Sequence, residues 1–290
     1  MGDPVSYPQD VLRCLQLVEL DMLRDLDRVC RELGLSYWLD SGTCLGAVRH
    51  GGFIPWDDDI DIGMPLDDYL RFQEQAPQLL PDNLTMHTCE NTPHMPVLWT
   101  KVFLKGTRFM ERRDCEAGLE QGIFIDIFPY INVDERPKVS ERQHRGFSLC
   151  QNLSYLNVFA HPATYNYSKN ARLAALACVL VHNTVARPFT PQRMARRAQR
   201  LMKVEQPGNE WRPVYAFASL KKNLPGELLL PVQPISFEGE TFMGPADPAG
   251  YLAALYGNSY MELPPENKRH THMPDILDFG DGINVMDTLR

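Results

Sequence analysis

Residues 38–63 read WLDSGTCLGAVRHGGFIPWDDDIDIG, and this stretch decides the fold. At its acidic end, Asp59 and Asp61 alternate with isoleucines, which is the period-two pattern of a strand. Residues two apart on a strand point the same way, so Asp59 and Asp61 share one face and the isoleucines turn into the core. Asp57 joins the two carboxylates if the strand begins early.

A metal ion is the expected partner of these carboxylates. Carboxylates held within a few ångströms of one another repel strongly, and burying them unpaired is costly. A divalent hard cation, Mg²⁺ or Mn²⁺, relieves that repulsion and prefers oxygen ligands, so we expect it to be bound by Asp57, Asp59 and Asp61. The alternative is an exposed acidic turn, but the flanking Ile and Trp residues favour an ordered, half-buried strand.

A second apolar strand carries one more carboxylate. Residues 122–129 read GIFIDIFP, with Asp126 as their single charge. We expect Asp126 to lie beside the first carboxylates, as a further metal ligand or as the base for an acceptor hydroxyl. The alternative is a structural ion pair with Arg49 or Lys101.

The front of the 38–63 stretch offers a phosphate cradle. Gly42 and Gly46 fit a tight turn from strand to helix, and Ser41 and Thr43 add hydroxyl groups to the backbone amides. A Ser-Gly-Thr sequence alone is a weak signal, but the carboxylates that follow it in the same stretch strengthen it.

The order of predicted elements favours an α/β or α+β catalytic core over residues 1–135. Helices are expected at 8–33 and 65–76, and further strands at 36–40, 84–89, 97–104 and 123–128. The fold class we predict is α+β, with a mixed β-sheet flanked by helices and a mainly helical second region.

Residues 136–230 form that second region, which is basic. Residues 136–222 contain 15 Lys and Arg against 3 acidic residues, a charge of +12, so the remainder of the chain, whose total is −8, carries −20. An apolar helix over 171–186 is too short to span a bilayer; we expect a buried core helix, with an interfacial helix as the alternative. The helix after Thr190 is amphipathic and basic, and its Arg193–Lys203 face either contacts an anionic membrane or simply faces water.

The remaining features bear on class and location. Residues 231–290 should pack back on the core, with a tail from 274 that shows no clear pattern and is expected to be partly disordered. No secretory signal or membrane-spanning run is visible, and seven Cys without a CxxC pair argue against a disulfide framework or a cysteine zinc site. We therefore expect a cytoplasmic protein, peripheral at the inner face of the membrane. Nucleic acid is an improbable partner, because the basic region has no recognisable binding fold and few aromatics among its arginines.

The run from residue 37 to 63 resembles the signature of the LicD family, which includes bacterial phosphocholine transferases and, more distantly, the catalytic domains of fukutin and fukutin-related protein. Residues 100–103 (TKVF), 122–129 and 263–270 (LPPENKRH) are also similar. The resemblance is dense over 10–135, loose over 250–273 and absent between them. It implies the nucleotidyltransferase fold, CDP-activated donors and a divalent metal.

The resemblance also implies roles for individual residues. Asp59 and Asp61 would be the metal pair and Asp126 the third carboxylate. Gly42 and Thr43 would lie against the donor phosphates, with Thr43 where Ser is more usual. The implied cationic groups around the donor or acceptor are Arg49, Lys101, Lys268, Arg269, His270 and His272. For Lys101 the alternative is a strand-edge lysine in water, and for the C-terminal group a solvated basic turn.

The function implied is transfer of a phospho-alcohol group, phosphocholine foremost, to a cell-surface glycan such as lipopolysaccharide or teichoic acid, or to its lipid-linked precursor. A nucleotidyltransferase that adds a nucleotide to a small molecule or protein, and an inactive glycan- or membrane-binding scaffold, are the alternatives. The sequence leaves open the alcohol, the acceptor, the number of metal ions and the oligomeric state. A choline pocket would need an aromatic cage, for which the candidates are Trp38, Trp56, Trp99, Tyr130, Tyr155, Tyr165 and Tyr167.

Overall fold

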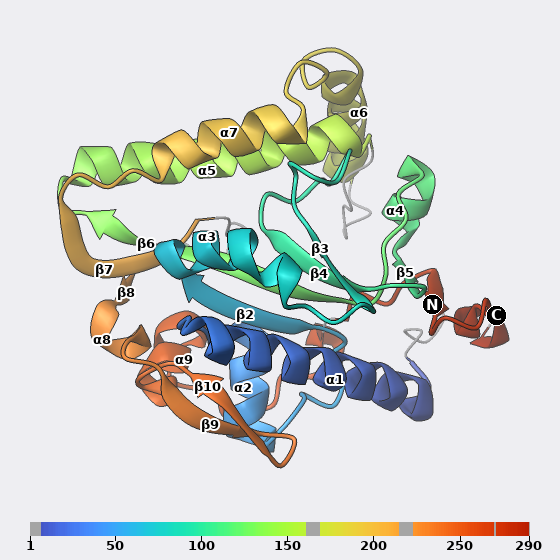
Figure 1. Cartoon of the computed structure of the whole chain (residues 1–290). Coiled ribbons are helices and arrows are strands. Elements are labelled where there is room, and N and C mark those ends of the chain that lie inside the picture. Colours follow the sequence, from blue (N-terminus) through green and yellow to red (C-terminus); the bar gives the residue numbers. More distant parts are fainter. Residues whose placement is uncertain (1–6, 161–168, 215–222, 270, 290) are drawn as a thin grey trace.

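A computed structural model describes residues 7–160, 169–214, 223–269 and 271–289. Its architecture is α+β, as predicted, and is built on a curled mixed sheet with strand order β1-β2-β6-β4-β3 (Figure 1). The strands are β1 Trp38–Leu39, β2 Ile60–Pro65, β3 Leu84–His87, β4 Thr100–Leu104, β6 Phe124–Asp134, β7 Pro207–Pro213 and β8 Leu224–Pro225. β2 and β6 run parallel, and β1, β4 and β3 pair antiparallel with their neighbours.

The sheet extends beyond residue 135. β6 pairs with β4 through its first half and with β7 through its second half, and β8 follows β7. β7 and β8 belong to the region 136–230 that was expected to be mainly helical, so this region also contributes two strands to the sheet. Their sequences contain prolines and charges rather than an alternating apolar pattern, so the sequence did not predict these two strands.

Helices α1 and α3 cover one face of the sheet. α1 spans Gln9–Leu33, closely as predicted, and turns a stripe of apolar residues onto the core; Gly34 ends it with a left-handed backbone, φ 62°. α3 spans Leu66–Gln75 and packs with α1 on the β2–β6 pair. These two helices fix the strands that carry the carboxylates.

Helices α5 Pro137–Val158 and α7 Pro191–Leu201 lie side by side above the sheet (Figure 1). α6, Lys169–Asn183, stands at their end. The expectation of a buried core helix here is wrong, because Leu176 is 66% exposed and Leu180 is 65% exposed. Among the described residues, no helix combines the length and apolarity needed to cross a bilayer.

The C-terminal part packs on the core. It consists of α8 Gly226–Leu229, the hairpin of β9 Gln233–Phe237 with β10 Glu240–Gly244, and α9 Pro248–Tyr256. α9 and β9 pack on α2 Ser41–His50, β10 packs on β1, and α8 packs on α9. The tail for which the sequence showed no pattern is ordered through residue 289: β11 Ile276–Asp278 pairs with β5 Arg108–Met110. Asn284 Oδ1 accepts a hydrogen bond from Leu277 N, 3.0 Å, which fixes the turn after β11.

Candidate metal and donor site

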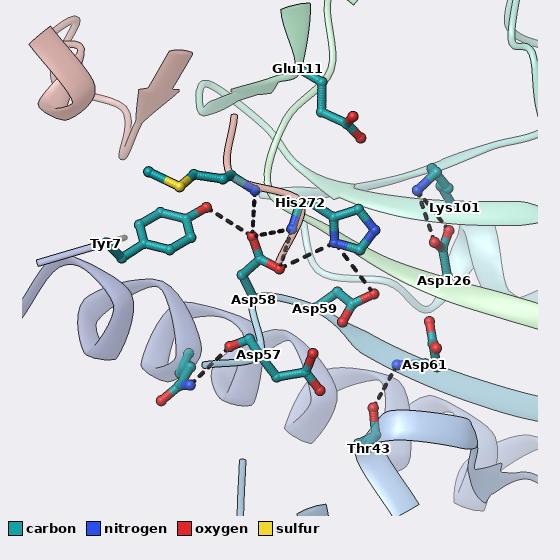
Figure 2. Close-up of polar contacts among 12 residues, drawn as sticks. Tyr7, Thr43, Asp57, Asp58, Asp59, Asp61, Lys101, Glu111, Asp126 and His272 are labelled. Carbon is teal, nitrogen blue, oxygen red and sulfur yellow. Dashed lines mark hydrogen bonds and ion pairs between the residues drawn. The ribbon is translucent and has the colours of Figure 1, made fainter. Parts of the chain in front are cut away.

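A row of charged residues crosses three adjacent strands. Asp61 on β2 and Asp126 on β6 are register partners across parallel strands, and Lys101 on β4 is the antiparallel partner of Asp126. The isoleucines on either side of both carboxylates are fully buried on the opposite face of the sheet. The alternation seen in the sequence therefore places the two carboxylates on one face, where Figure 2 shows Asp59 beside them.

Asp126 already has two partners. Lys101 Nζ lies 2.9 Å from its carboxylate, and the indole nitrogen of Trp99 donates to Oδ1 at 2.8 Å. Lys101 also lies 3.3 Å from the centroid of the Phe124 ring and is only 8% exposed. The alternative of an ion pair between Asp126 and Lys101 is thus present, and Lys101 is not a strand-edge lysine in water.

Asp57 lies outside the strand, because β2 begins at Ile60. Its backbone carbonyl accepts a hydrogen bond from Gln16 Nε2 at 3.0 Å, which ties it to α1. A Cβ atom on Gly42 would lie 3.0 Å from Asp57 Oδ2, so the glycine lets this carboxylate approach the start of α2.

Asp58 is an anchor that the sequence interpretation missed. It is fully buried and accepts hydrogen bonds from the Tyr7 hydroxyl at 2.9 Å and from the backbone N–H groups of His272 at 2.9 Å and Met273 at 3.0 Å. Three segments far apart in the chain meet at this carboxylate (Figure 2). Strand alternation could not have identified it, because residues 57–59 precede β2.

His272 bridges the anchor and the site. Its Nδ1 lies 3.2 Å from Asp58 Oδ1 and 3.8 Å from Asp59 Oδ2. Burial would lower the pKa of His272, but the charges of Asp59 and Asp58 raise it well above its usual value. Burial likewise opposes the shift of Asp58, whose pKa is held below its usual value by the hydrogen bond and charge of His272.

For Asp57, Asp59 and Asp61, the nearby positive charge does not offset the cost of burying a carboxylate. Burial raises the pKa of Asp59 to about 6. The positive charge of His272 acts to lower this pKa, and the charges of Asp58 and Asp126 act to raise it. Burial and then the charge of Asp59 raise the pKa of Asp57 and of Asp61 well above the usual value. A cluster of hard oxygen donors that resist ionisation for lack of a counter-charge fits Mg²⁺ or Mn²⁺. Asp58, Asp59 and His272 also offer ligand atoms within 4.8 Å of one another, the one such group among the described residues.

The start of α2 is joined to the site by side-chain hydrogen bonds. Thr43 Oγ1 accepts from the Asp61 N–H at 2.9 Å, so this hydroxyl holds the helix against β2. Asp40, 1% exposed, caps the helix at Ser41 and accepts from the hydroxyls of Tyr130 and Tyr251. The strand-to-helix turn is as tight as predicted, since Asp40 alone separates β1 from α2.

The predicted cations divide into two groups. Lys101 and His272 lie at the carboxylates, whereas Arg49 and Arg269 gather at Trp56, with guanidinium carbons 6.0 and 4.2 Å from its ring. Arg49 Nη1 also donates to two backbone carbonyls, at 3.0 and 3.3 Å, of the segment after α9. Lys268 is exposed, and His270 lies outside the described residues.

A cavity of about 560 Å³ opens beside the charged row. Its polar end is lined by Asp40, Asp59, Asp61, Lys101, Asp126 and His272. Gly42, Thr43, Arg49, Asp57, Lys268 and Arg269 are not among the described residues that line it. The structure therefore brings five of the predicted site residues, together with Ser41 of the predicted phosphate cradle, to one cavity.

Tyr155 and Phe159, whose rings contact each other, form the aromatic end of the cavity lining. Of the cage candidates, Trp99, Tyr130 and Tyr155 line the cavity, Trp38 and Trp56 are not among its described lining residues, and Tyr165 and Tyr167 lie outside the described residues. The Arg113 guanidinium lies 5.5 Å from the ring of Tyr155 and 5.7 Å from that of Phe159, and it pairs with Glu111. The sequence interpretation singled out neither Arg113 nor Glu111.

Glu19 is a further buried carboxyl group, close enough to Asp57, Asp58 and Asp59 to be affected by their charges. It lies on the buried stripe of α1, 1% exposed, and its Oε2 has no hydrogen-bond partner among the residues that the structure describes. Burial, followed by the charges of Asp59, Asp58 and Asp57, raises its pKa well above the usual value. A glutamate on the apolar stripe of a predicted helix was the signal that could have identified it.

Comparison with known proteins relates this site to transferases. Residues 34–155 match the family model described as LicD/FKTN/FKRP, nucleotidyltransferase domain. The chain is 38% identical over 133 residues to the lipopolysaccharide cholinephosphotransferase LicD of Haemophilus influenzae, across 44% of this chain and 47% of that protein. It is 52% identical over 75 residues to the ribitol 5-phosphate transferase FKRP of Homo sapiens, across 23% of this chain and 14% of that protein.

A third relative is the ribitol-5-phosphate transferase FKTN of Mus musculus, 41% identical over 59 residues, across 19% of this chain and 13% of that protein. The chain thus spans less than half the length of each of these three relatives.

Proposed function

We propose that this chain, whose residues 34–155 match the nucleotidyltransferase domain model of the LicD family, is a metal-dependent transferase of phospho-alcohol groups. The donor would be CDP-activated, with CDP-choline foremost, and the acceptor a cell-surface glycan or its lipid-linked precursor. The observation that carries this proposal is the register of Asp61 with Asp126, beside Asp59, at the polar end of one cavity.

Asp59 and Asp61 are the residues that would hold Mg²⁺ or Mn²⁺. The raised pKa of both carboxyls supports this, because a bound cation would supply the counter-charge that they lack. When bound, the ion would neutralise charge on the donor diphosphate. Asp57, whose backbone is tied to α1, would hold the loop before β2 in place. Asp126, opposite Asp61 on β6, would be the third carboxylate of the site.

Lys101 would act on the donor, and Asp126 would act on the acceptor. Lys101 would bind the donor diphosphate, which frees Asp126 to take the proton of the acceptor hydroxyl. The acceptor oxygen forms a bond to the phosphorus that carries the alcohol. The bond between the two phosphates then breaks, and its electron pair leaves with CMP. Thr43 and Asp40 would hold α2 against the strand during this exchange.

Two aromatic rings in the cavity lining bear on the choice of alcohol. Tyr155 and Phe159 hold the Arg113 guanidinium, which pairs with Glu111. A quaternary ammonium carries the same charge and would bind these rings only in place of Arg113, so the choice of choline rests on the similarity to a cholinephosphotransferase. The relatives' names include both choline and ribitol phosphate, so the alcohol must be tested directly.

The test is a binding and product assay on the purified chain. Thermal unfolding would be followed with CDP-choline, CDP-ethanolamine, CDP-ribitol and CDP-glycerol, each with and without Mg²⁺. We expect the largest stabilisation from CDP-choline with Mg²⁺, and CMP as the product when acceptor is added. Release of pyrophosphate from a nucleoside triphosphate would indicate a nucleotidyltransferase instead. A chain that neither metal nor any donor stabilises would be a scaffold.

A further inference from the structure

The apolar residues of α6 from Leu176 onward are exposed or half-buried. From Leu176 to Val181 the helix carries no charged residue, and every described side chain of α6 from 176 onward is exposed or half-buried. Val185, just after the helix, is 56% exposed. Two-thirds-exposed leucines one helical turn apart form an unpartnered apolar face, which costs solvation free energy until something covers it.

α6 is fixed to the end of α5 that borders the cavity. His182 Nδ1 lies 2.9 Å from the Leu156 carbonyl oxygen, and Asn157 Nδ2 donates to the Ala186 carbonyl oxygen at 2.9 Å. Leu156 and Asn157 lie between Tyr155 and Phe159, which line the aromatic end of the cavity. The C-terminal end of α6 is therefore held beside the end of α5 at which Tyr155 and Phe159 line the cavity.

Positive charge accompanies this face. The segment 184–190 joins α6 to α7, whose buried side packs on α5 and whose arginines at 193, 196, 197 and 200 are all exposed. Within the described parts of the chain, none of these four arginines forms an ion pair with an acidic residue. Unpaired arginines beside an apolar helix complement an anionic lipid surface, which takes apolar side chains below its headgroups and attracts cations above them.

We propose that α6, flanked by the arginines of α7, docks this protein on an anionic lipid bilayer. The helix lies in the interface plane, with Leu176 and Leu180 inserted below the headgroups. This surface differs from the one expected from the sequence, because the apolar contact comes from α6 and the arginines of α7 add only attraction.

Vesicle sedimentation of the full chain tests the docking, and it needs neither donor nor metal. The vesicles contain equal parts phosphatidylglycerol and phosphatidylcholine, at low salt, with pure phosphatidylcholine for comparison. We expect the chain to bind the anionic vesicles, and L176E/L180E to bind at least about tenfold more weakly. R193E/R197E should weaken binding to anionic vesicles and leave the weak binding to pure phosphatidylcholine unchanged.

The matched control is L17E/I283E, which adds the same two charges at positions 45% and 59% exposed elsewhere on the surface. It should bind like the unaltered chain. If L176E/L180E lowers the thermal midpoint, L176Q/L180Q replaces it. Absence of vesicle binding, or equal loss in the α6 variant and the control, would overturn the proposal. A dimer that L176E/L180E converts to monomer, without vesicle binding, would overturn it in favour of a second copy of this chain.

Discussion

Asp61 and Asp126 face each other as register partners on the parallel strands β2 and β6, while Lys101 closes the row from β4. Parallel pairing brings two carboxylates from segments more than sixty residues apart onto one face of the sheet. Only Asp126 has a cationic partner within the row, because Lys101 pairs with it at 2.9 Å. Asp61 is left with a raised pKa, and this imbalance underlies the predictions below.

Replacing Asp61 by Asn should abolish transfer without unfolding the protein. Asn keeps the shape of the side chain but removes a charge that burial and Asp59 disfavour, so the free energy of unfolding without metal should stay equal or rise. Transfer should fall at least about 100-fold, because a metal ligand is lost. CMP release and urea unfolding measure the two effects. D67N, at an exposed aspartate on α3, is the control; equal activity loss in both variants would exclude a role for Asp61.

Metal binding should strengthen as the pH rises through about 6. The raised pKa of Asp59, about 6, means that the folded protein holds a proton there that the unfolded chain releases nearer pH 4. Without metal, this group's contribution to stability is therefore lost as the pH rises from about 4 to about 6. A cation must displace that proton, so its stabilising effect should grow over the same range. Thermal shifts with Mn²⁺ or Mg²⁺ at about pH 5 and about pH 7.5 measure this; EDTA should reverse them. A shift that is independent of pH would contradict the assignment of Asp59.

Lys101 and Asp126 should be strongly coupled in stability. Each side chain is about one-tenth exposed, so K101M leaves Asp126 buried with Trp99 as its one remaining side-chain partner among the described residues. Removing one member of a buried pair costs about 3–5 kcal/mol, whereas removing both charges costs much less. A double-mutant cycle of K101M and D126N in urea measures the coupling. Additive effects of the two substitutions would show that the pair is not coupled.

Asp58 should matter more for stability than His272. D58A removes the acceptor of the Tyr7 hydroxyl and of two backbone N–H groups, so it should destabilise the fold by about 3 kcal/mol or more. H272A keeps both backbone hydrogen bonds and loses only the ring, which should cost about 1 kcal/mol.

Limited proteolysis gives an independent measure of the same anchor. The segment after residue 268 should be cleaved faster in D58A than in H272A. If the two variants behave alike, the ring of His272 rather than the carboxylate of Asp58 is the anchor.

The local pattern of the sequence was sufficient for the elements and for part of the site. Alternation of aspartate with isoleucine at residues 59–62, and a single carboxylate within GIFIDIFP, are properties of short segments, because a strand buries every second side chain wherever it lies. Those patterns predicted the α+β class, both carboxylate-bearing strands and helix α1. They left the pairing of Asp126 with Lys101 as one of several alternatives, because that pairing depends on the register between two strands.

Sequence alone thus determined which carboxylates share a strand face, since that follows from backbone geometry two residues at a time. Tertiary structure decided which groups form ion pairs and hydrogen bonds with the buried carboxylates. The hydrogen bonds of Asp58 reach 51 residues back to Tyr7 and 214 residues forward to His272, distances over which no local periodicity carries information. It also decided that α6 is exposed, because burial depends on what packs against a helix and not on its composition.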